Sequence, residues 1–122
     1  MDTSPAAIVL FGHGSRDPLW HRPMQAVAQR ISAQEPDVQV LCAFLELTQP
    51  DLAQATLSLV QAGVQRITVV PMFLGLGKHA REDLPALVHA MRAQYPQVLF
   101  NLQCAVSEDP RLIEQLAQIA LS

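Results

Sequence analysis

The chain has 122 residues, with 8 Lys and Arg against 11 Asp and Glu, and its formal net charge at pH 7 is −3. A chain of this length that is 50% hydrophobic can bury one core without disulfide or metal staples. The lack of a basic stripe argues against nucleic acid as the main partner, and no apolar run approaches the roughly 20 residues that span a bilayer. The first residues also lack the basic start of a signal peptide. We therefore expect a single cytoplasmic domain over residues 1–122, with no membrane partner.

The first predicted strand, Ala7–Phe11, is a continuous apolar run, which is typical of a strand covered on both faces. It leads into the turn GHGSR, residues 12–16, where the imidazole of His13 lies at a sharp change of chain direction. Asp17-Pro18 then predicts a helix start, because Asp suits the N-cap and proline the first helical position. The turn is not a G-x-G-x-x-G fingerprint, a P-loop or a nucleophile elbow. Its backbone N–H groups indicate a place for an anion.

The middle of the chain predicts two helices and a second strand. Apolar residues recur at helical spacing in two sets, namely Met24, Val27, Ala28 and Ile31, and then Leu52, Ala55, Leu59 and Val60. Between the two helices lies the predicted strand Val38–Phe44, and Glu46 follows it closely. Thr48 with Asp51 resembles a capping box, and Gly63 suits the position just past the end of the second helix.

The last part of the chain repeats the order strand then helix twice. The predicted strand Arg66–Pro71 is followed by the glycine-rich loop LGLGK, residues 74–78, and then by His79 near the start of a third helix. The fourth predicted strand is Val98–Leu102, and Asp109-Pro110 predicts the start of a fourth helix. The chain thus alternates strand and helix four times.

The predicted strands begin about 30 residues apart, which is the length of a right-handed βαβ unit. This spacing predicts an α/β fold, a three-layer sandwich with a parallel four-stranded sheet. By analogy with flavodoxin-like proteins we expect the strand order 2-1-3-4. In that order the connections diverge between the first and third strands, and ligands bind beyond the carboxyl ends of the strands at this point.

Three side chains suited to metal binding follow the predicted strands, namely His13, Glu46 and His79. If the first and third strands are neighbours, the two histidines face each other across the switch point, and neutral imidazole suits Co²⁺, Ni²⁺, Fe²⁺ or Zn²⁺. Each residue taken alone could instead be an ordinary loop residue. We expect His21 and His89 to be surface or packed helix residues outside this site.

Three segments together resemble the small CbiX-type sirohydrochlorin chelatases, which belong to the class II tetrapyrrole chelatases. These segments are VLFGHGSRDP, FLE and VVPMFLGLGKHAREDLP, and they occur in this order across nearly the whole chain. The resemblance implies a lyase that inserts Co²⁺ or Fe²⁺, and in some relatives Ni²⁺, into sirohydrochlorin on the way to cobalamin, siroheme or a nickel tetrapyrrole. The metal is then a substrate, and no organic cofactor is implied. The resemblance also implies that His13 and His79 bind the metal and that Glu46 joins them as ligand or proton acceptor.

Sirohydrochlorin is a polycarboxylate, so an acidic protein needs local positive charge to hold it. Arg16, Lys78 and Arg81 are candidates, together with the backbone N–H groups of Gly14 and Ser15. The larger class II chelatases have two α/β halves with the tetrapyrrole between them, whereas this chain supplies one chelatase-like half-domain. We therefore expect a homodimer that buries apolar residues of the loop 72–76 and of the last helix, such as Leu112, Ile113 and Leu116.

Two other functions fit the same residues. A metal-binding carrier or regulator could use the same histidines without catalysis. Another flavodoxin-like enzyme could act on a phosphorylated or acyl substrate through the turn at residues 12–16. Cys42 and Cys104 are far apart and have no CxxC spacing. We therefore expect both to be free, buried thiols that take no part in the function of the protein.

Overall fold

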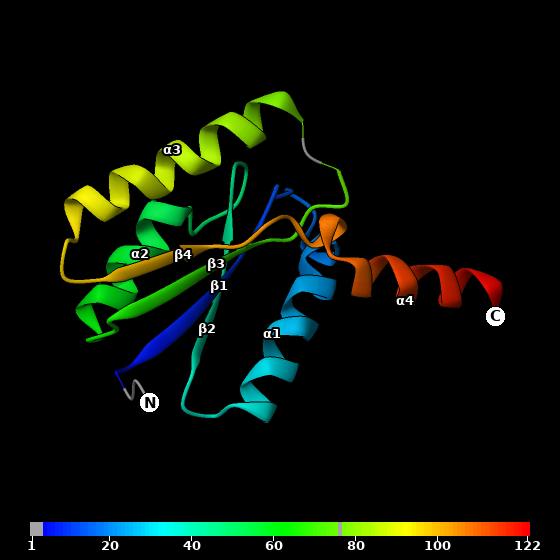
Figure 1. Cartoon of the computed structure of the whole chain (residues 1–122), viewed down its shortest axis with the longest axis horizontal. Coiled ribbons are helices and arrows are strands. Elements are labelled where there is room, and N and C mark those ends of the chain that lie inside the picture. Colours follow the sequence, from blue (N-terminus) through cyan, green and yellow to red (C-terminus); the bar gives the residue numbers. More distant parts are fainter. Residues whose placement is uncertain (1–3, 76) are drawn as a thin grey trace.

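The computed structural model describes residues 4–75 and 77–122, and for His79 it describes the backbone alone. Four strands form one sheet: β1 (Ala6–Gly12), β2 (Gln39–Phe44), β3 (Arg66–Pro71) and β4 (Leu99–Leu102). Every pair is parallel and the order is β2-β1-β3-β4 (Figure 1). The predicted strands and their order are confirmed, and each strand boundary lies within one residue of its prediction.

Four α-helices and two short 3₁₀ turns connect and follow the strands: η1 (Pro18–His21), α1 (Arg22–Gln34), α2 (Leu52–Gln61), α3 (Lys78–Gln94), η2 (Val106–Glu108) and α4 (Pro110–Leu121). The predicted cap at Asp17 is present, because its carboxylate accepts a 3.0 Å hydrogen bond from the Leu19 N–H. It begins η1 rather than α1, and α1 starts only at Arg22, with a second proline in its first turn.

The predicted capping box at α2 is wrong by three residues. Asp51 is the N-cap, and its carboxylate accepts a bond from the Gln54 N–H at 2.8 Å while the Gln54 side chain accepts one from the Asp51 N–H at 2.9 Å. Thr48 lies before the cap, and its hydroxyl bonds to the loop after β1 instead. At the far end of the same helix Gly63 has φ +88°, as expected for the residue that ends a helix in the left-handed conformation.

The helices cover the two faces of the sheet unequally. α2 and α3 lie on one face, and α1 lies on the other (Figure 1). The face under α2 and α3 forms the larger core, in which Val9 and Val69 have no exposed surface and Ile67 has 1%. Under α1, by contrast, the buried residues are Leu10, Met24 and Phe44, while Ile8 and Val70 are only partly buried. Val27, predicted to face the core, is 39% exposed.

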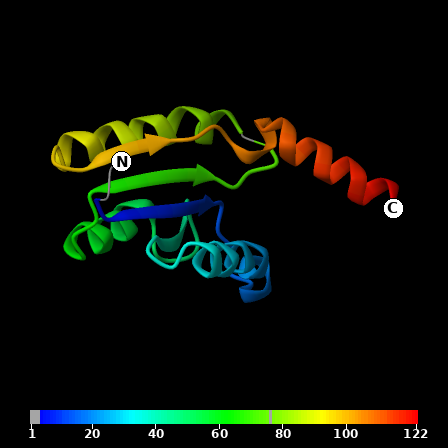
Figure 2. The same cartoon turned by 60° about the horizontal axis from the view of Figure 1, so that its bottom comes forward.

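The last helix, α4, belongs to neither layer. It leaves the carboxyl edge of the sheet after η2 and extends away from the rest of the molecule (Figures 1 and 2). None of its residues is buried.

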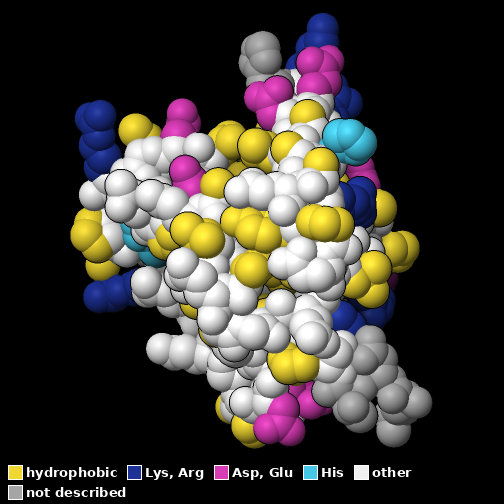
Figure 3. Space-filling model, turned by 90° about the vertical axis from the view of Figure 1, so that its left-hand side faces the viewer, with side chains coloured by type: hydrophobic (Ala, Val, Ile, Leu, Met, Phe, Trp, Pro, Cys, Tyr) yellow, Lys and Arg dark blue, Asp and Glu magenta, His cyan; other side chains and the backbone are white. Residues whose placement is uncertain are grey.

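Figure 3 shows the end of the molecule opposite to α4, near the starts of the strands. Hydrophobic side chains occupy much of the centre of this face, and charged ones lie mainly toward its margins. Among the described residues, no helix is both long and apolar enough to cross a membrane.

Candidate functional site

The loops after β1 and β2 are joined beyond the ends of their strands. The Leu45 N–H donates to the Gly12 carbonyl at 2.8 Å, and the Glu46 N–H donates to the His13 carbonyl at 3.0 Å. These two bonds continue the ladder of parallel strands past the sheet. They bring the backbones of His13 and Glu46, which are 33 positions apart in the sequence, side by side at the carboxyl edge.

Gly14 makes this close approach possible. A Cβ at this position would lie 1.8 Å from the Glu46 carbonyl oxygen, and the backbone has φ +95°, where side chains other than glycine are strained. Any larger residue would therefore push the two loops apart.

The imidazole of His13 packs against an aromatic residue that follows β3. His13 is exposed, and its ring packs edge-on against Phe73, with ring centroids 4.4 Å apart and an interplanar angle of 76°. Phe73 follows β3 and is 2% exposed, and it also packs edge-on against Phe11 at 5.9 Å. The buried aromatic pair thus gives the exposed imidazole a fixed support on one edge.

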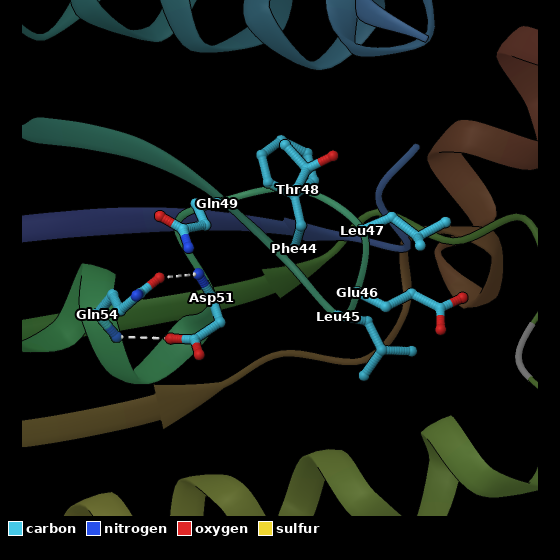
Figure 4. A pocket seen from close by; sticks show the side chains of 8 residues that line it. All are labelled: Phe44, Leu45, Glu46, Leu47, Thr48, Gln49, Asp51 and Gln54. Atoms are coloured by element: carbon cyan, nitrogen blue, oxygen red, sulfur yellow. Dashed lines mark hydrogen bonds between the residues drawn. The ribbon is translucent and has the colours of Figure 1, made fainter. Parts of the chain in front are cut away.

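Glu46 projects from a strained turn. The Thr48 N–H donates to the Glu46 carbonyl at 2.8 Å, and Leu47 between them has φ 64°. This is a γ-turn with positive φ at a leucine, a conformation that costs free energy and is found mostly at functional sites. Figure 4 shows the exposed Glu46 side chain pointing away from Asp51 and Gln54, beside a hollow of about 370 Å³.

A threonine ties three segments together behind these loops. The Thr48 hydroxyl donates to the Ser15 carbonyl at 2.6 Å and accepts from the Ser15 N–H at 3.2 Å. Since its single proton is used, the 3.2 Å contact with His21 Nε2 makes that nitrogen the donor. The half-buried His21 ring also packs on Phe44, 4.8 Å between centroids.

His21 is packed and not on the surface, which is one of the two places expected for it. It lies in the 3₁₀ turn before α1, and it holds the β1 and β2 loops in register rather than standing on a helix surface. The sequence offered one sign of this, a histidine four residues after a strong cap, but its partner Thr48 is 27 residues away.

Internal bonds use one N–H group of the predicted anion-binding turn and the N–H group of the residue that follows the turn. The Ser15 N–H donates to Thr48, and the Asp17 N–H donates to the Ser15 hydroxyl at 3.0 Å. The expectation that the Ser15 N–H is available to a ligand is therefore wrong. Of the predicted cationic groups, Arg16 lies exposed in this loop, while Lys78 and Arg81 are exposed in the first turn of α3.

The predicted ligand set of His13, Glu46 and His79 stays a prediction. His79 is the second residue of α3, and its side chain lies outside the described residues. Within 4–75 and 77–122, no group of three His, Cys, Asp or Glu side chains is placed to hold a metal ion. Cys42 and Cys104 are free thiols, as expected, although Cys104 is exposed and Cys42 only half-buried rather than both buried.

The chain resembles known proteins over most of its length. A family model described as CbiX matches residues 7–120. A sirohydrochlorin cobaltochelatase from Methanopyrus kandleri is 34% identical over 82 residues, which are 67% of this chain and 57% of that protein. A protein of the same name from Methanosarcina acetivorans is 33% identical over 86 residues, which are 70% and 66% of the two chains. The chain thus spans less than two thirds of these relatives.

Solved structures resemble it across the whole fold. A CbiX protein from Marinobacter aquaeolei VT8 has a TM-score of 0.81 at 29% identity, covering 95% of this chain and 94% of that one. The sirohydrochlorin chelatase SirB from Bacillus subtilis subspecies spizizenii, in complex with cobalt, has a TM-score of 0.76 at 25% identity. That match covers 93% of this chain and 48% of SirB, so this chain corresponds to about half of it.

Proposed function

Because the chain belongs to the CbiX family, whose model spans residues 7–120, we propose that it inserts a divalent metal into sirohydrochlorin. The metal is Co²⁺ or Fe²⁺, with Ni²⁺ as a further candidate, and the product serves cobalamin or siroheme biosynthesis. This family membership is the observation that carries the proposal. The joined loops of His13 and Glu46 support it, because they lie at the edge of the sheet where α/β proteins bind ligands.

The reaction needs a metal donor and a proton acceptor. The macrocycle gives up two pyrrole protons and the ion takes their place, so no electrons are transferred. We propose that His13, His79 and Glu46 hold the ion as substrate on one face of the ring. Imidazole nitrogen and carboxylate oxygen are suitable ligands for these ions, and the same groups can accept the released protons.

The support under His13 suits a transfer of this kind. An imidazole packed on the buried Phe73 keeps its orientation while its other edge stays exposed. Glu46 extends from a turn that is fixed by its backbone bond to His13. We propose that this pair presents the ion to the ring without enclosing it, which leaves the ion free to move into the macrocycle.

The carboxylates of the substrate need cationic partners. We propose that Arg16, Lys78 and Arg81 bind them, since all three are exposed, Arg16 in the loop after β1 and the other two in the first turn of α3. Gly14 and Ser15 would line the same edge with backbone, and Ser15 would do so without its N–H, which is bonded to Thr48.

We propose further that residues 1–122 act as one cytoplasmic domain and that two copies form the working enzyme. The match to about half of SirB supports this, because a flat macrocycle bound on one half would leave its other face in water.

Metallation assays test the proposal. Purified protein is mixed with sirohydrochlorin and Co²⁺, Fe²⁺ or Ni²⁺ separately, and the absorbance change is compared with a protein-free blank. We expect His13→Ala and His79→Ala to abolish the catalysed rate and Glu46→Gln to lower it about 100-fold. The matched control is His89→Ala on the exposed surface of α3, which should keep the wild-type rate, and circular dichroism checks every fold.

Two results would contradict the proposal. Wild-type rates in either His13→Ala or His79→Ala would remove the site assignment. Stoichiometric Co²⁺ binding with no consumption in the presence of sirohydrochlorin would favour the metal carrier instead.

A further inference from the structure

The chain has a helix and a sheet surface that are both uncovered. On α4 the apolar side chains form one stripe, while Arg111, Glu114 and Gln118 lie on the opposite side. The stripe consists of Leu112, Ile113, Leu116, Ala117, Ile119 and Ala120. Ile113 is 55% exposed and Ile119 is 68% exposed. An apolar stripe of this length stays in water only at a considerable cost in free energy.

The uncovered sheet surface lies on the α1 side over β3 and β4. We call it the open strip and define it by Thr68, Val70, Leu99 and Asn101. Phe100 between the last two is buried in the core under α2 and α3, so its neighbours in β4 point to the α1 side. Leu99 is 65% exposed, and no β4 residue joins the described cluster under α1.

One hollow lies on the open strip itself, and another lies at its carboxyl end. One of about 380 Å³ is bounded by residues that include Thr68, Leu99 and Asn101. The other, about 470 Å³, lies at the carboxyl end between α1 and the base of α4 and is lined largely by apolar side chains, among them Met72 and Val27. Parallel sheets are generally covered by helices on both faces, and within residues 4–75 and 77–122 no helix covers this half of the α1 side.

The helix and the strip match in length. α4 has 12 residues, about 18 Å at 1.5 Å per residue. β3 has 6 residues, about 20 Å at 3.3 Å per residue. One amphipathic helix of this size covers one strand and its neighbour.

The helix of the same chain is directed away from its own strip. The corner before α4 is closed by backbone bonds from Glu108 N–H to Ala105 at 2.9 Å and from Asp109 N–H to Val106 at 3.1 Å. Ala105 is 4% exposed, and Asp109 caps the helix by accepting from the Arg111 N–H at 2.9 Å. Turning α4 back onto its own sheet would break this corner.

We infer that α4 docks on the open strip of a second copy of this chain, and that the second copy returns its own α4 to the first. A two-fold axis makes the exchange reciprocal and closed. The second copy would also take the place of the other half of SirB, since the match covers 48% of SirB. The inference deepens the proposed homodimer and rests on it, but it concerns assembly and not metal chemistry.

Sedimentation with paired variants tests the exchange. Val70→Glu places a charge on the strip, and Leu116→Glu places one on the helix stripe. Each should weaken dimerisation at least about tenfold while circular dichroism stays that of the wild type. An equimolar mixture of the two should recover part of the dimerisation, because one of the two contacts in a mixed dimer joins an intact helix to an intact strip. Gln118→Glu, on the polar side of α4, is the control and should stay dimeric.

Cross-linking tests directly whether the apolar stripe of α4 contacts the open strip of the second copy. In a Cys104→Ser background, one chain carries Leu116→Cys and a differently tagged chain carries Leu99→Cys. We expect a disulfide between the two tags in the mixture. Should Val70→Glu not fold, Leu99→Glu replaces it, because that side chain is already 65% exposed.

Three outcomes would overturn the inference: a monomeric wild type at micromolar concentration, loss of dimers in Leu116→Glu but not in the strip variants, or no recovery on mixing. None of these assays contains metal or tetrapyrrole. A protein that exchanges α4 but does not metallate sirohydrochlorin would therefore contradict only the proposed activity.

Discussion

The two faces of the sheet show how one small domain separates folding from assembly. Val69 points to the α2 and α3 side and has no exposed surface, whereas the next residue, Val70, points to the α1 side and is partly buried. The first face is covered by two helices of its own chain and forms the main core. The second is covered by α1 over only part of its width, while α4 stands apart. We conclude that the first face provides most of the monomer's stability and that the second is available to a partner.

The largest difference between the two faces, measured as loss in the free energy of unfolding, should come from the two residues just past β3. Phe73→Ala removes a ring that is 2% exposed, so we expect a loss of about 3–5 kcal/mol in the free energy of unfolding. It also removes the support of His13, and metallation should fall in any protein that remains folded. Met72→Ala, on the α1 side, should cost about 2 kcal/mol or less. Urea unfolding measures both, and equal losses would contradict the comparison.

Two neighbouring valines in β3 provide a second test of the comparison between the two faces of the sheet. Val69→Ala should lower the free energy of unfolding by about 2 kcal/mol, and Val70→Ala by about 1 kcal/mol in dilute protein. If a second copy covers the open strip, the loss for Val70→Ala should grow with protein concentration while that for Val69→Ala stays constant. Thermal unfolding at several concentrations measures this, and two concentration-independent losses would place both valines in the monomer alone.

Two threonines allow a comparison of polar groups, one in the loops of the candidate site and one in the core under α2 and α3. Thr48→Val removes the hydroxyl that joins Ser15 and His21, so we expect a loss of about 1–2 kcal/mol and slower metallation. Thr48→Ser should restore both. Thr56→Val, in the core under α2 and α3, removes bonds to Leu52 and Met91 and should cost about 1 kcal/mol without changing the metallation rate of folded protein. Equal effects on the rate would remove the role of Thr48 in positioning the loops.

The smallest effect is on thiol reactivity. Burial on the α1 side raises the pKa of the Cys42 thiol, so less of it is thiolate at neutral pH. Cys104 is exposed. A thiol reagent should therefore label Cys104 first, and the labelling of Cys42 should accelerate as the pH rises above the range of a free thiol. Mass spectrometry of time points identifies each site, and the reverse order of labelling would show that α1 does not shield this side.

The sequence by itself determined the strands, their order in the chain and the positions of the residues that follow them. Continuous apolar runs such as Ala7–Phe11 and Arg66–Pro71, in a chain that alternates strand and helix, are typical of a parallel sheet buried on both faces. Since all strands then end at one edge, His13 and Glu46 were predicted to lie together, and their backbones do. The amphipathic pattern of α4 likewise follows from local spacing alone.

The tertiary structure decided what those residues contact. Thr48 has the spacing of a cap, yet it bonds to Ser15 and His21, which are 33 and 27 residues away, because the joined loops bring them within reach. Leu47 adopts positive φ, which no propensity for leucine predicts, because the turn beside it is held by backbone bonds. An apolar stripe specifies that α4 must be covered but not by what, since burial is non-directional. The direction of the chain at Ala105–Asp109 is what turns α4 away from its own sheet.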